Sequence, residues 1–165
     1  MEKFVIKWHG NFYDCEWSDD SNFEKLNRVL GVHGFVFNEN NEICLVKYSK
    51  DKHWAPLGGG CEKEDKTFED TFIREVKEEA DLDLEEIKRV GSIHIIPRHN
   101  PKDEHYQLRF AARIKKINEQ TTDPAKGEIS QRIFVNKRDF CKFTGWEKDA
   151  DMQINKALKK LEEER

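Results

Sequence analysis

The stretch REVKEEADL at residues 74–82 places four acidic side chains within seven positions, shortly after the glycine run at residues 58–60. On a helix that turns 100° per residue, three of the carboxylates fall within an arc of roughly 100°. These carboxylates belong to Glu75, Glu78 and Glu79. Like charges three or four positions apart on a helix repel one another. Any fold of this chain must therefore solvate the three carboxylates or neutralise them with a cation.

Carboxylate oxygens are the ligands that hard divalent ions such as Mg²⁺ and Mn²⁺ prefer, and these ions often bridge to substrate phosphates. Glycines ahead of the helix let the backbone approach such a ligand closely. The alternative is an acidic face that is simply solvated, which is common in a chain with 38% charged residues. The residues alone leave both interpretations open.

The cluster lies on a predicted helix over residues 67–80. Thr67 can cap the helix, and Asp70 stands three positions later, as in a capping box. One stripe of the helix is apolar and is predicted to face the core; it consists of Phe72, Ile73, Val76 and Ala80.

The rest of the chain predicts mixed strands and helices. Alternating apolar residues around Gly10-Asn11 predict an N-terminal hairpin, in which Trp8 and Trp17 are core residues in preference to the walls of a base pocket. A second hairpin is predicted around the turn NENNE at residues 38–42. The remaining predictions are a short helix at 19–30, a loop at 49–66, strands at 87–96, 105–117 and 129–135, and a helix at 147–163. This order indicates one α+β domain over residues 1–165.

Composition narrows the class of partner and the location. The 29 basic and 33 acidic residues nearly cancel, which argues against a nucleic-acid partner. No apolar run is long enough to cross a membrane, and the N-terminus lacks the apolar stretch of a signal peptide. The four scattered cysteines suit free thiols in a reducing compartment. We therefore expect a cytoplasmic protein, either monomeric or homodimeric.

Residues 54–82, WAPLGGGCEKEDKTFEDTFIREVKEEADL, resemble the signature of the Nudix hydrolases, G-x5-E-x7-R-E-U-x-E-E-x-G-U, where U is a bulky aliphatic residue. The core REVKEE matches without a gap, and Leu82 fits the last aliphatic position. The resemblance implies a Nudix-type α/β/α sandwich with a mixed β-sheet, an N-terminal hairpin and a C-terminal helix.

The stretch departs from the signature in three places. Counting back from the helix puts the first glutamate of the signature on Lys66, whereas counting forward from Gly59 puts it on Asp65. We favour Asp65, which keeps the negative charge and implies one inserted residue. The late glycine of the signature is Asp81, so the helix must end without a residue of positive φ or with an aspartate that tolerates one. Pro56-Leu57 also reverses the usual Leu-Pro order.

The resemblance implies hydrolysis of a nucleoside diphosphate linked to another group, with Mg²⁺ or Mn²⁺ as cofactor. Arg74 would orient the carboxylates, and Glu75 would serve as a further ligand or as the base that deprotonates water. The implied metal ligands are Glu78 and Glu79, joined by Glu75 and a carbonyl of Gly59 or Gly60.

Some members of the family complete the site with a later acidic residue, for which Glu128 is the candidate and Glu104 the second choice. Arg98 or Arg109 is predicted to hold a phosphate, and Tyr106 to stack on a base. These three belong to a basic and aromatic group that also includes His94, His99 and His105. Alternating strand faces explain this group equally well.

Two other functions compete with hydrolysis. One is a Nudix-fold nucleotide sensor that binds its ligand without turnover, a reading motivated by the altered outer acidic position. The other is an isoprenoid diphosphate isomerase, which needs a catalytic cysteine that the sequence does not identify. The intact REVKEE favours the hydrolase over both.

Overall fold

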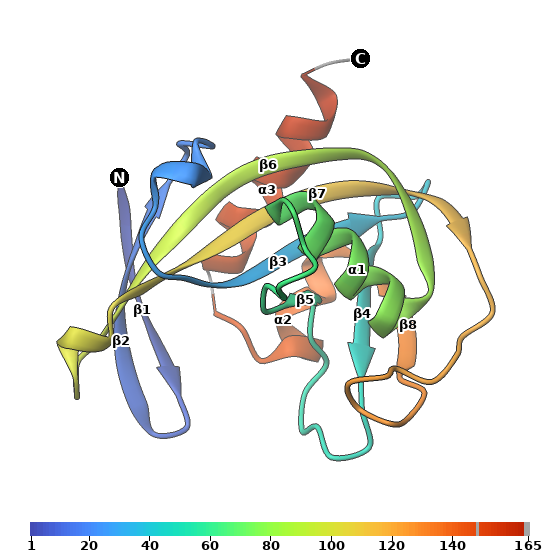
Figure 1. The fold of residues 1–165 in the computed structure, drawn as a ribbon, viewed down its shortest axis with the longest axis horizontal. Coiled ribbons are helices and arrows are strands. Elements are labelled where there is room, and N and C mark those ends of the chain that lie inside the picture. Colours follow the sequence, from blue (N-terminus) through green and yellow to red (C-terminus); the bar gives the residue numbers. More distant parts are fainter. Residues whose placement is uncertain (148, 164–165) are drawn as a thin grey trace.

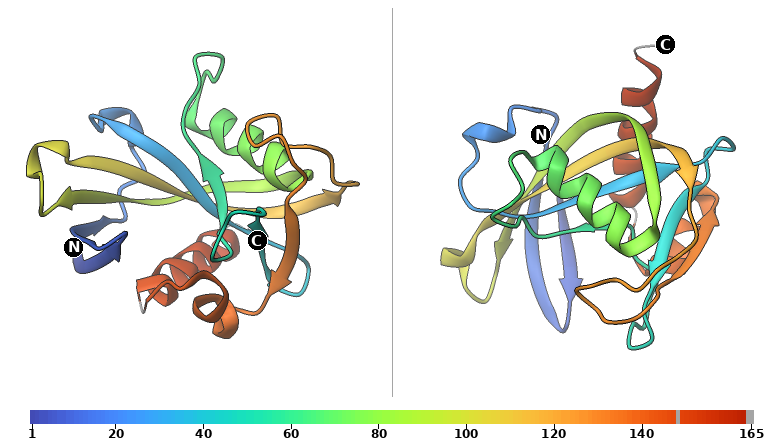
Figure 2. Two further views of the ribbon diagram at one scale, coloured as in Figure 1. Left: turned by 90° about the horizontal axis from the view of Figure 1, so that it is seen from below. Right: turned by 45° about the vertical axis from the view of Figure 1, so that its right-hand side comes forward.

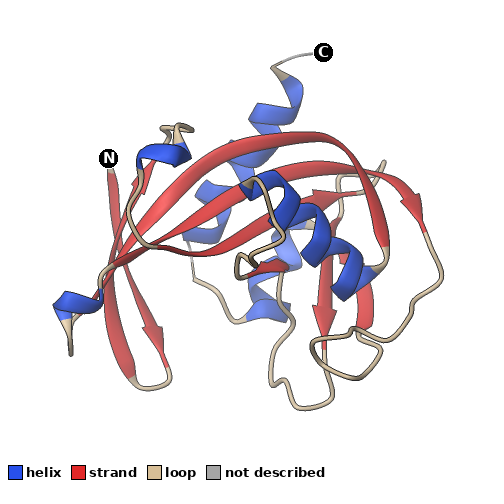
Figure 3. Cartoon of the chain, viewed as in Figure 1, coloured by secondary structure: helices blue, strands red, loops and turns tan. Residues whose placement is uncertain are grey.

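The computed structural model describes residues 1–147 and 149–163. Strands make one mixed sheet in the order β1-β2-β6-β7-β3-β4-β8, and β5 pairs with β3 outside this path (Figures 1 and 3). The strands are β1 (Glu2–Trp8), β2 (Asn11–Ser18), β3 (Val29–Phe37), β4 (Ile43–Lys47), β5 (Leu57–Gly59), β6 (Leu82–Pro97), β7 (His105–Ile117) and β8 (Gln131–Val135). The helices are α1 (Phe68–Ala80), α2 (Phe140–Thr144) and α3 (Asp149–Glu162), with 3-10 turns at Phe23–Lys25, Pro101–Asp103 and Lys137–Asp139.

Helices cover both faces of the sheet, as the view from below in Figure 2 shows. One apolar cluster lies between the sheet and α1 and is built around Phe72, Val76 and Phe110. The other lies between the sheet and α3 and is built around Phe35 and Ile154. The expected α+β sandwich with its N-terminal hairpin and C-terminal helix is confirmed.

The sheet forks along β3. The first part of β3 pairs with β5, from Val32↔Gly59 to Gly34↔Leu57, whereas its last residue, Phe37, pairs with Ile43 of β4. On its other side β3 runs parallel to β7. The glycine strand β5 therefore leaves the main sheet and passes close to α1.

Several sequence predictions need correction. The predicted helix at 19–30 contains only the turn Phe23–Lys25, because Val29 already pairs with Tyr106 of β7. Strand β5 lies inside the predicted loop, α2 was not predicted, and β6 starts at Leu82. The predicted helix 147–163 is observed as α3, and its residue 148 lies outside the described residues. Trp17 is buried as predicted, but Trp8 is 62% exposed.

Among the described residues, no helix has both the length and the apolar character needed to cross a lipid bilayer.

Candidate active site

Helix α1 begins with the predicted capping box. The Thr67 hydroxyl accepts a hydrogen bond from the Asp70 amide, and the Asp70 carboxylate accepts one from the Thr67 amide. Phe72 and Val76 are fully buried, which fixes the rotation of the helix about its axis. Ile73 was predicted to be buried but is 43% exposed. The buried stripe is thus narrower than predicted, and the acidic face turns toward β5.

Arg74 is the centre of a charged network before and along α1. Its Nη2 donates to the Gly60 carbonyl at 2.8 Å, and its Nη1 donates to Glu75 at 3.1 Å and to Glu78 at 3.3 Å. Glu78 is the more open of the two glutamates, with 22% of its side chain exposed. One guanidinium therefore fixes two of the three clustered carboxylates and the end of the glycine run.

Asp65 supplies the outer carboxylate of this network. It accepts from Arg74 Nε at 3.0 Å and Nη2 at 2.9 Å, and from the Thr71 hydroxyl at 2.9 Å. Only 6% of its side chain is exposed, and hydrogen bonding to Arg74 holds the pKa of the Asp65 carboxyl well below its usual range. Lys66 offers only its backbone amide, which donates to Asp70. Of the two residues weighed for the outer position, the geometry brings Asp65 to the arginine.

The glycines of β5 lie directly against the acidic face of α1. The Gly58 amide donates to the Glu79 carboxylate at 3.0 Å. Gly58 has a backbone φ of 150°, which residues with a side chain rarely adopt. A Cβ atom on Gly59 would stand 2.3 Å from the Glu75 carboxylate. Only glycines at these positions let β5 lie this close to the acidic face of α1. The sequence predicted a close approach of the glycine backbone to a ligand, but not its packing against these glutamates.

The carboxylates of Glu75 and Glu79 are destabilised in their charged form. Burial raises the pKa of Glu79 to about 8, although the Gly58 amide opposes this shift. Burial also raises the pKa of Glu75, against the effect of Arg74. The negative charge of Asp123 raises the pKa of both glutamates further.

Asp123 is a site residue that the sequence analysis missed. It is buried, accepts a hydrogen bond from the Tyr48 hydroxyl, and interacts electrostatically with Glu75 and Glu79. The predicted candidate Glu128 instead bonds the amide and hydroxyl of Ser49 at 3.3 and 3.0 Å. The segment DPAKG that starts at Asp123 carries a turn signal that could have marked this loop.

The predicted substrate residues are dispersed, and the structure does not gather them at the glutamates. Arg98 forms an ion pair with Asp14 just beyond the end of β6, the end opposite to the one joined to α1. Tyr106 stacks on His94, which bonds the second-choice acid, Glu104.

Arg109 is buried between the sheet and α3. Its Nε donates to Gln153 at 2.9 Å, and burial lowers its pKa to about 10. The register of β3 and β7 places it beside His33, one strand away from Gly58. Arg109 is thus covered by protein, although it lies close to the site.

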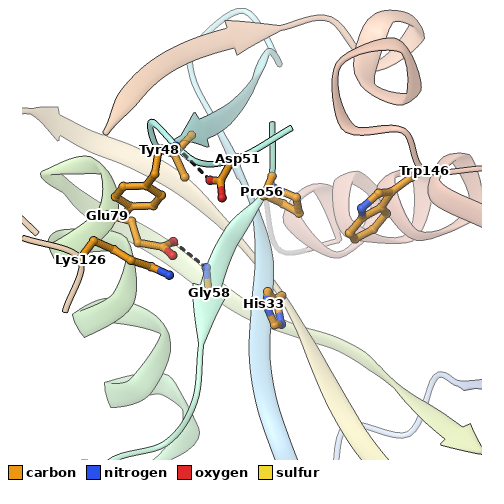
Figure 4. A pocket seen from close by; sticks show the side chains of 10 residues that line it. His33, Tyr48, Asp51, Pro56, Gly58, Glu79, Lys126 and Trp146 are labelled. Atoms are coloured by element: carbon orange, nitrogen blue, oxygen red, sulfur yellow. Dashed lines mark hydrogen bonds between the residues drawn. The ribbon is translucent and has the colours of Figure 1, made fainter. Parts of the chain in front are cut away.

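A cavity of about 250 Å³ opens beside Glu79 at the fork of the sheet. Figure 4 shows Glu79 and Lys126 at one end, Trp146 at the other and His33 between them. Burial lowers the pKa of His33 to about 3, so its ring is neutral at pH 7. The Trp146 ring is held edge-on against Phe35 and Phe140. The cavity thus joins an acidic end to an aromatic end.

The donor chemistry along α1 fits a hard divalent cation, because the carboxylates of Glu75 and Glu78 and the Gly60 carbonyl gather around Arg74, with the Glu79 carboxylate on the same helix face. Within residues 1–147 and 149–163, no three His, Cys, Asp or Glu side chains already form a metal cage. The hydrogen bonds explain why: Arg74 holds Glu75 and Glu78, and the Gly58 amide holds Glu79.

Known proteins share this fold. The structure of the Bacillus subtilis pyrophosphohydrolase superposes with a TM-score of 0.74 at 17% identity, over 96% of this chain and 97% of that one. The NUDIX domain of Shewanella oneidensis NrtR, complexed with ADP ribose, has a TM-score of 0.61 at 16% identity, over 85% and 92%. An ADP-ribose pyrophosphatase from Streptococcus suis has a TM-score of 0.55 at 23% identity, over 84% and 93%.

The sequence gives a closer assignment than these structural likenesses. Nudix hydrolase 5 of Arabidopsis thaliana is 30% identical over 100 residues, which are 57% of this chain and 33% of that protein. The matched region thus spans about a third of the relative's length. The sequence profile of the NUDIX domain matches residues 27–156, which include the glycine strand, α1 and the loop that carries Asp123. The chain therefore belongs to the Nudix family.

Proposed function

We propose that this protein hydrolyses the diphosphate bond of a nucleoside diphosphate linked to another group, with Mg²⁺ or Mn²⁺ as cofactor. The observation that carries the proposal is the packing of the α1 glutamates against the glycine strand, where the Gly58 amide bonds Glu79 and only a glycine at position 59 leaves room for the Glu75 carboxylate. Desolvation and mutual repulsion raise the pKa of both glutamates. A divalent cation would remove that penalty, because it stabilises the charged carboxylates that protons otherwise neutralise.

In this proposal Glu78 and Glu79 hold the metal, with Glu75 and the carbonyls of Gly59 or Gly60 as further ligands. The bound metal would neutralise the diphosphate and lower the pKa of a coordinated water. Arg74 fixes the orientation of Glu75 and Glu78 through its Nη1. Asp123 takes the place first assigned to Glu128, since its carboxylate interacts with both buried glutamates.

The proton of the attacking water is assigned to a carboxylate of this group. Glu75 is the first choice, because it lies beside the proposed ligand Glu78 and its carboxylate is oriented by Arg74. Asp123 is the second choice, and its hydrogen bond from Tyr48 fixes its orientation.

We assign the cavity to the organic group attached to the diphosphate. Lys126 lies at the Glu79 end, where it can contact phosphate, and Trp146 offers an aromatic surface at the other end (Figure 4). Neutral His33 can donate or accept one hydrogen bond to a polar heterocycle. Nucleobases combine a planar ring with such polar edges, so a nucleoside derivative suits this cavity.

The main competing function is a nucleotide sensor. The NUDIX domain complexed with ADP ribose shows that a protein of this fold binds such a ligand. The isomerase is the weaker alternative, because no cysteine is among the described residues that line the cavity. A cytoplasmic location belongs to the proposal, and the four free cysteines support it.

Turnover is the direct test. Purified protein is incubated with dinucleoside polyphosphates, nucleotide sugars and ADP-ribose in Mg²⁺ or Mn²⁺, and products are identified by mass spectrometry. We expect hydrolysis of at least one substrate, and a loss of at least roughly 100-fold in kcat in Glu78→Gln and Glu79→Gln. Glu64→Gln, which changes an exposed glutamate of the preceding loop, should retain activity.

Three results would contradict the proposal in different ways. Full activity after complete chelation would exclude the metal-dependent mechanism. Specific nucleotide binding without turnover of any substrate would favour the sensor. Equal loss of activity in Glu64→Gln and Glu79→Gln would show that charge removal alone, and not a particular site, causes the effect.

A further inference from the structure

Helix α1 ends at Asp81, where the family signature has glycine. Asp81 is in the left-handed conformation at φ 50° and ψ 45°, which is less favourable for a residue with a side chain than for glycine. Its amide still donates to the Lys77 carbonyl at 3.0 Å, so the helix end itself is ordinary. A glycine would end the helix without that cost, so the aspartate side chain requires another explanation.

The Asp81 carboxylate is 6% exposed and binds the segment that follows β7. It accepts a hydrogen bond from the Thr121 amide at 2.7 Å and from the Thr121 hydroxyl at 3.1 Å. The Asp81 carbonyl accepts from the Asn118 amide at 3.0 Å. One residue at the end of α1 thus satisfies three donors of the loop between β7 and β8.

The same loop closes over the last turn of α1 from its other end. The Ser130 hydroxyl donates to the Glu79 carbonyl at 2.6 Å. Arg132 donates to the Ala80 carbonyl and, at 3.2 Å, to the Asn118 carbonyl. Both ends of the segment 118–130 are therefore fastened to the helix turn that carries Glu79.

Between these two attachments the loop carries Asp123 and Lys126. Asp123 organises the turn around itself: its carboxylate accepts from the Ala125 amide at 2.8 Å, and its carbonyl accepts from the Gly127 amide at 2.8 Å. The far side of the carboxylate is bonded by the Tyr48 hydroxyl. The loop therefore holds the Asp123 carboxylate in one orientation next to Tyr48 and places Lys126 at the acidic end of the cavity.

We propose that Asp81 is a positioning residue, which fastens the loop 118–130 to the end of α1 so that Asp123 and Lys126 face Glu75 and Glu79. The effect on catalysis rests on the proposed function. The attachment of the loop to Asp81 is a property of the fold and can be measured without substrate. A glycine at this position would retain the helix end and lose the fastening.

Three variants test the inference. Asp81→Gly removes the carboxylate and restores the glycine of the signature. Asp81→Asn is the conservative variant, because its amide oxygen can still accept from the Thr121 amide and asparagine tolerates the left-handed conformation. Thr121→Val removes only the hydroxyl donor and is available should Asp81→Gly fail to fold. Amide hydrogen exchange of residues 118–130, Mn²⁺ affinity by calorimetry, and kcat and KM are measured for each.

In Asp81→Gly we expect exchange in 118–130 to accelerate at least roughly 10-fold and kcat/KM to fall roughly 10-fold, because the approach of Asp123 is no longer fixed. Exchange in the middle of α1 should be unchanged. Asp81→Asn should stay within about threefold of wild type in the exchange rate of residues 118–130 and in kcat/KM. Thr121→Val should give values between those of Asp81→Asn and Asp81→Gly.

Unchanged exchange in Asp81→Gly overturns the inference, as does faster exchange with wild-type kcat/KM. If wild type turns over none of the substrates, the proposed hydrolase activity fails on its own account. In that case the Mn²⁺ affinity decides: a weaker affinity in Asp81→Gly than in Asp81→Asn supports the positioning role, and equal affinities contradict it.

Discussion

At the scale of single residues, Arg74 provides the positive charge that the protein itself places within the acidic cluster. Its guanidinium contacts Asp65, Glu75 and Glu78, which lie on both sides of it in the sequence. One positive charge cannot balance three carboxylates and also reach Glu79. The charge left over is concentrated on the buried glutamates, where a divalent ion would be most stabilising.

The pair Asp65 and Lys66 offers a test at the same scale. Asp65→Ala should lower the free energy of unfolding by about 2 kcal/mol, because it removes nearly buried hydrogen bonds to Arg74 and leaves its guanidinium partly unpaired. Lys66→Ala should change the free energy of unfolding by less than about 0.5 kcal/mol, because the Lys66 side chain is exposed to solvent. Urea unfolding followed by circular dichroism measures both. A larger effect from Lys66 would mean that the outer position is misassigned.

At the scale of elements, the short strand β5 determines the geometry of the site more than its length suggests. It pairs with β3 on one side and contacts α1 on the other, so its lack of side chains is what allows the helix to approach. The close contact at Gly59 is with the end of a flexible glutamate side chain and not with backbone.

Gly59→Ala should therefore impair function without unfolding the protein. The new methyl group would displace the Glu75 carboxylate, which can rotate away, so we expect a melting temperature within a few degrees of wild type. Activity should fall roughly 100-fold because a misplaced carboxylate no longer faces Glu79. Thermal unfolding and kinetics of the same preparation check this. Gly10→Ala, in the β1–β2 turn away from the site, is the control: no atom lies within 4 Å of the added methyl, although its φ of 80° adds some strain.

The elements also show why part of the site was predictable from sequence. Helix α1 contains its own signals, since Thr67, Asp70 and the apolar period are all local. The glutamates proposed as metal ligands lie on this helix and could be predicted with it. Asp123 and His33 become site residues only because the sheet order brings β3 and the loop after β7 to the same helix. The helix predicted at 19–30 is wrong for a related reason: the chain pairs with β7 from Val29, and Val29 is itself a β-branched residue that favours a strand.

At the scale of the whole molecule, the cavity lies where the two apolar layers separate. Glu79 reaches it from α1 on one face of the sheet, and Trp146 reaches it from the segment before α3 on the other. Burial in this region shifts two pKa values in opposite directions, that of His33 to about 3 and that of Glu79 to about 8. The stability of the metal-free protein should therefore depend on pH in a characteristic way.

The sign of this pH dependence follows from whether the folded or the unfolded state binds more protons. Between pH 3 and 6.5 the unfolded chain protonates His33 and the folded protein does not, so acid is destabilising there. Between pH 4.5 and 8 the folded protein retains the Glu79 proton that the unfolded chain has lost, so stability falls as pH rises. The two effects oppose each other up to pH 6.5, and above it only that of Glu79 continues.

In chelator, we therefore expect the free energy of unfolding to fall by roughly 1–2 kcal/mol between pH 6.5 and 8. Glu79→Gln should abolish this decline, because the amide keeps the Gly58 hydrogen bond and does not titrate, whereas His33→Gln should preserve it. Saturating Mn²⁺ should flatten the decline, since the metal-bound protein holds Glu79 ionised and neither state then carries its proton in this range. Urea titrations across this range measure all three, and a decline of the same size in Glu79→Gln would place the responsible proton elsewhere, with Glu75 as the next candidate.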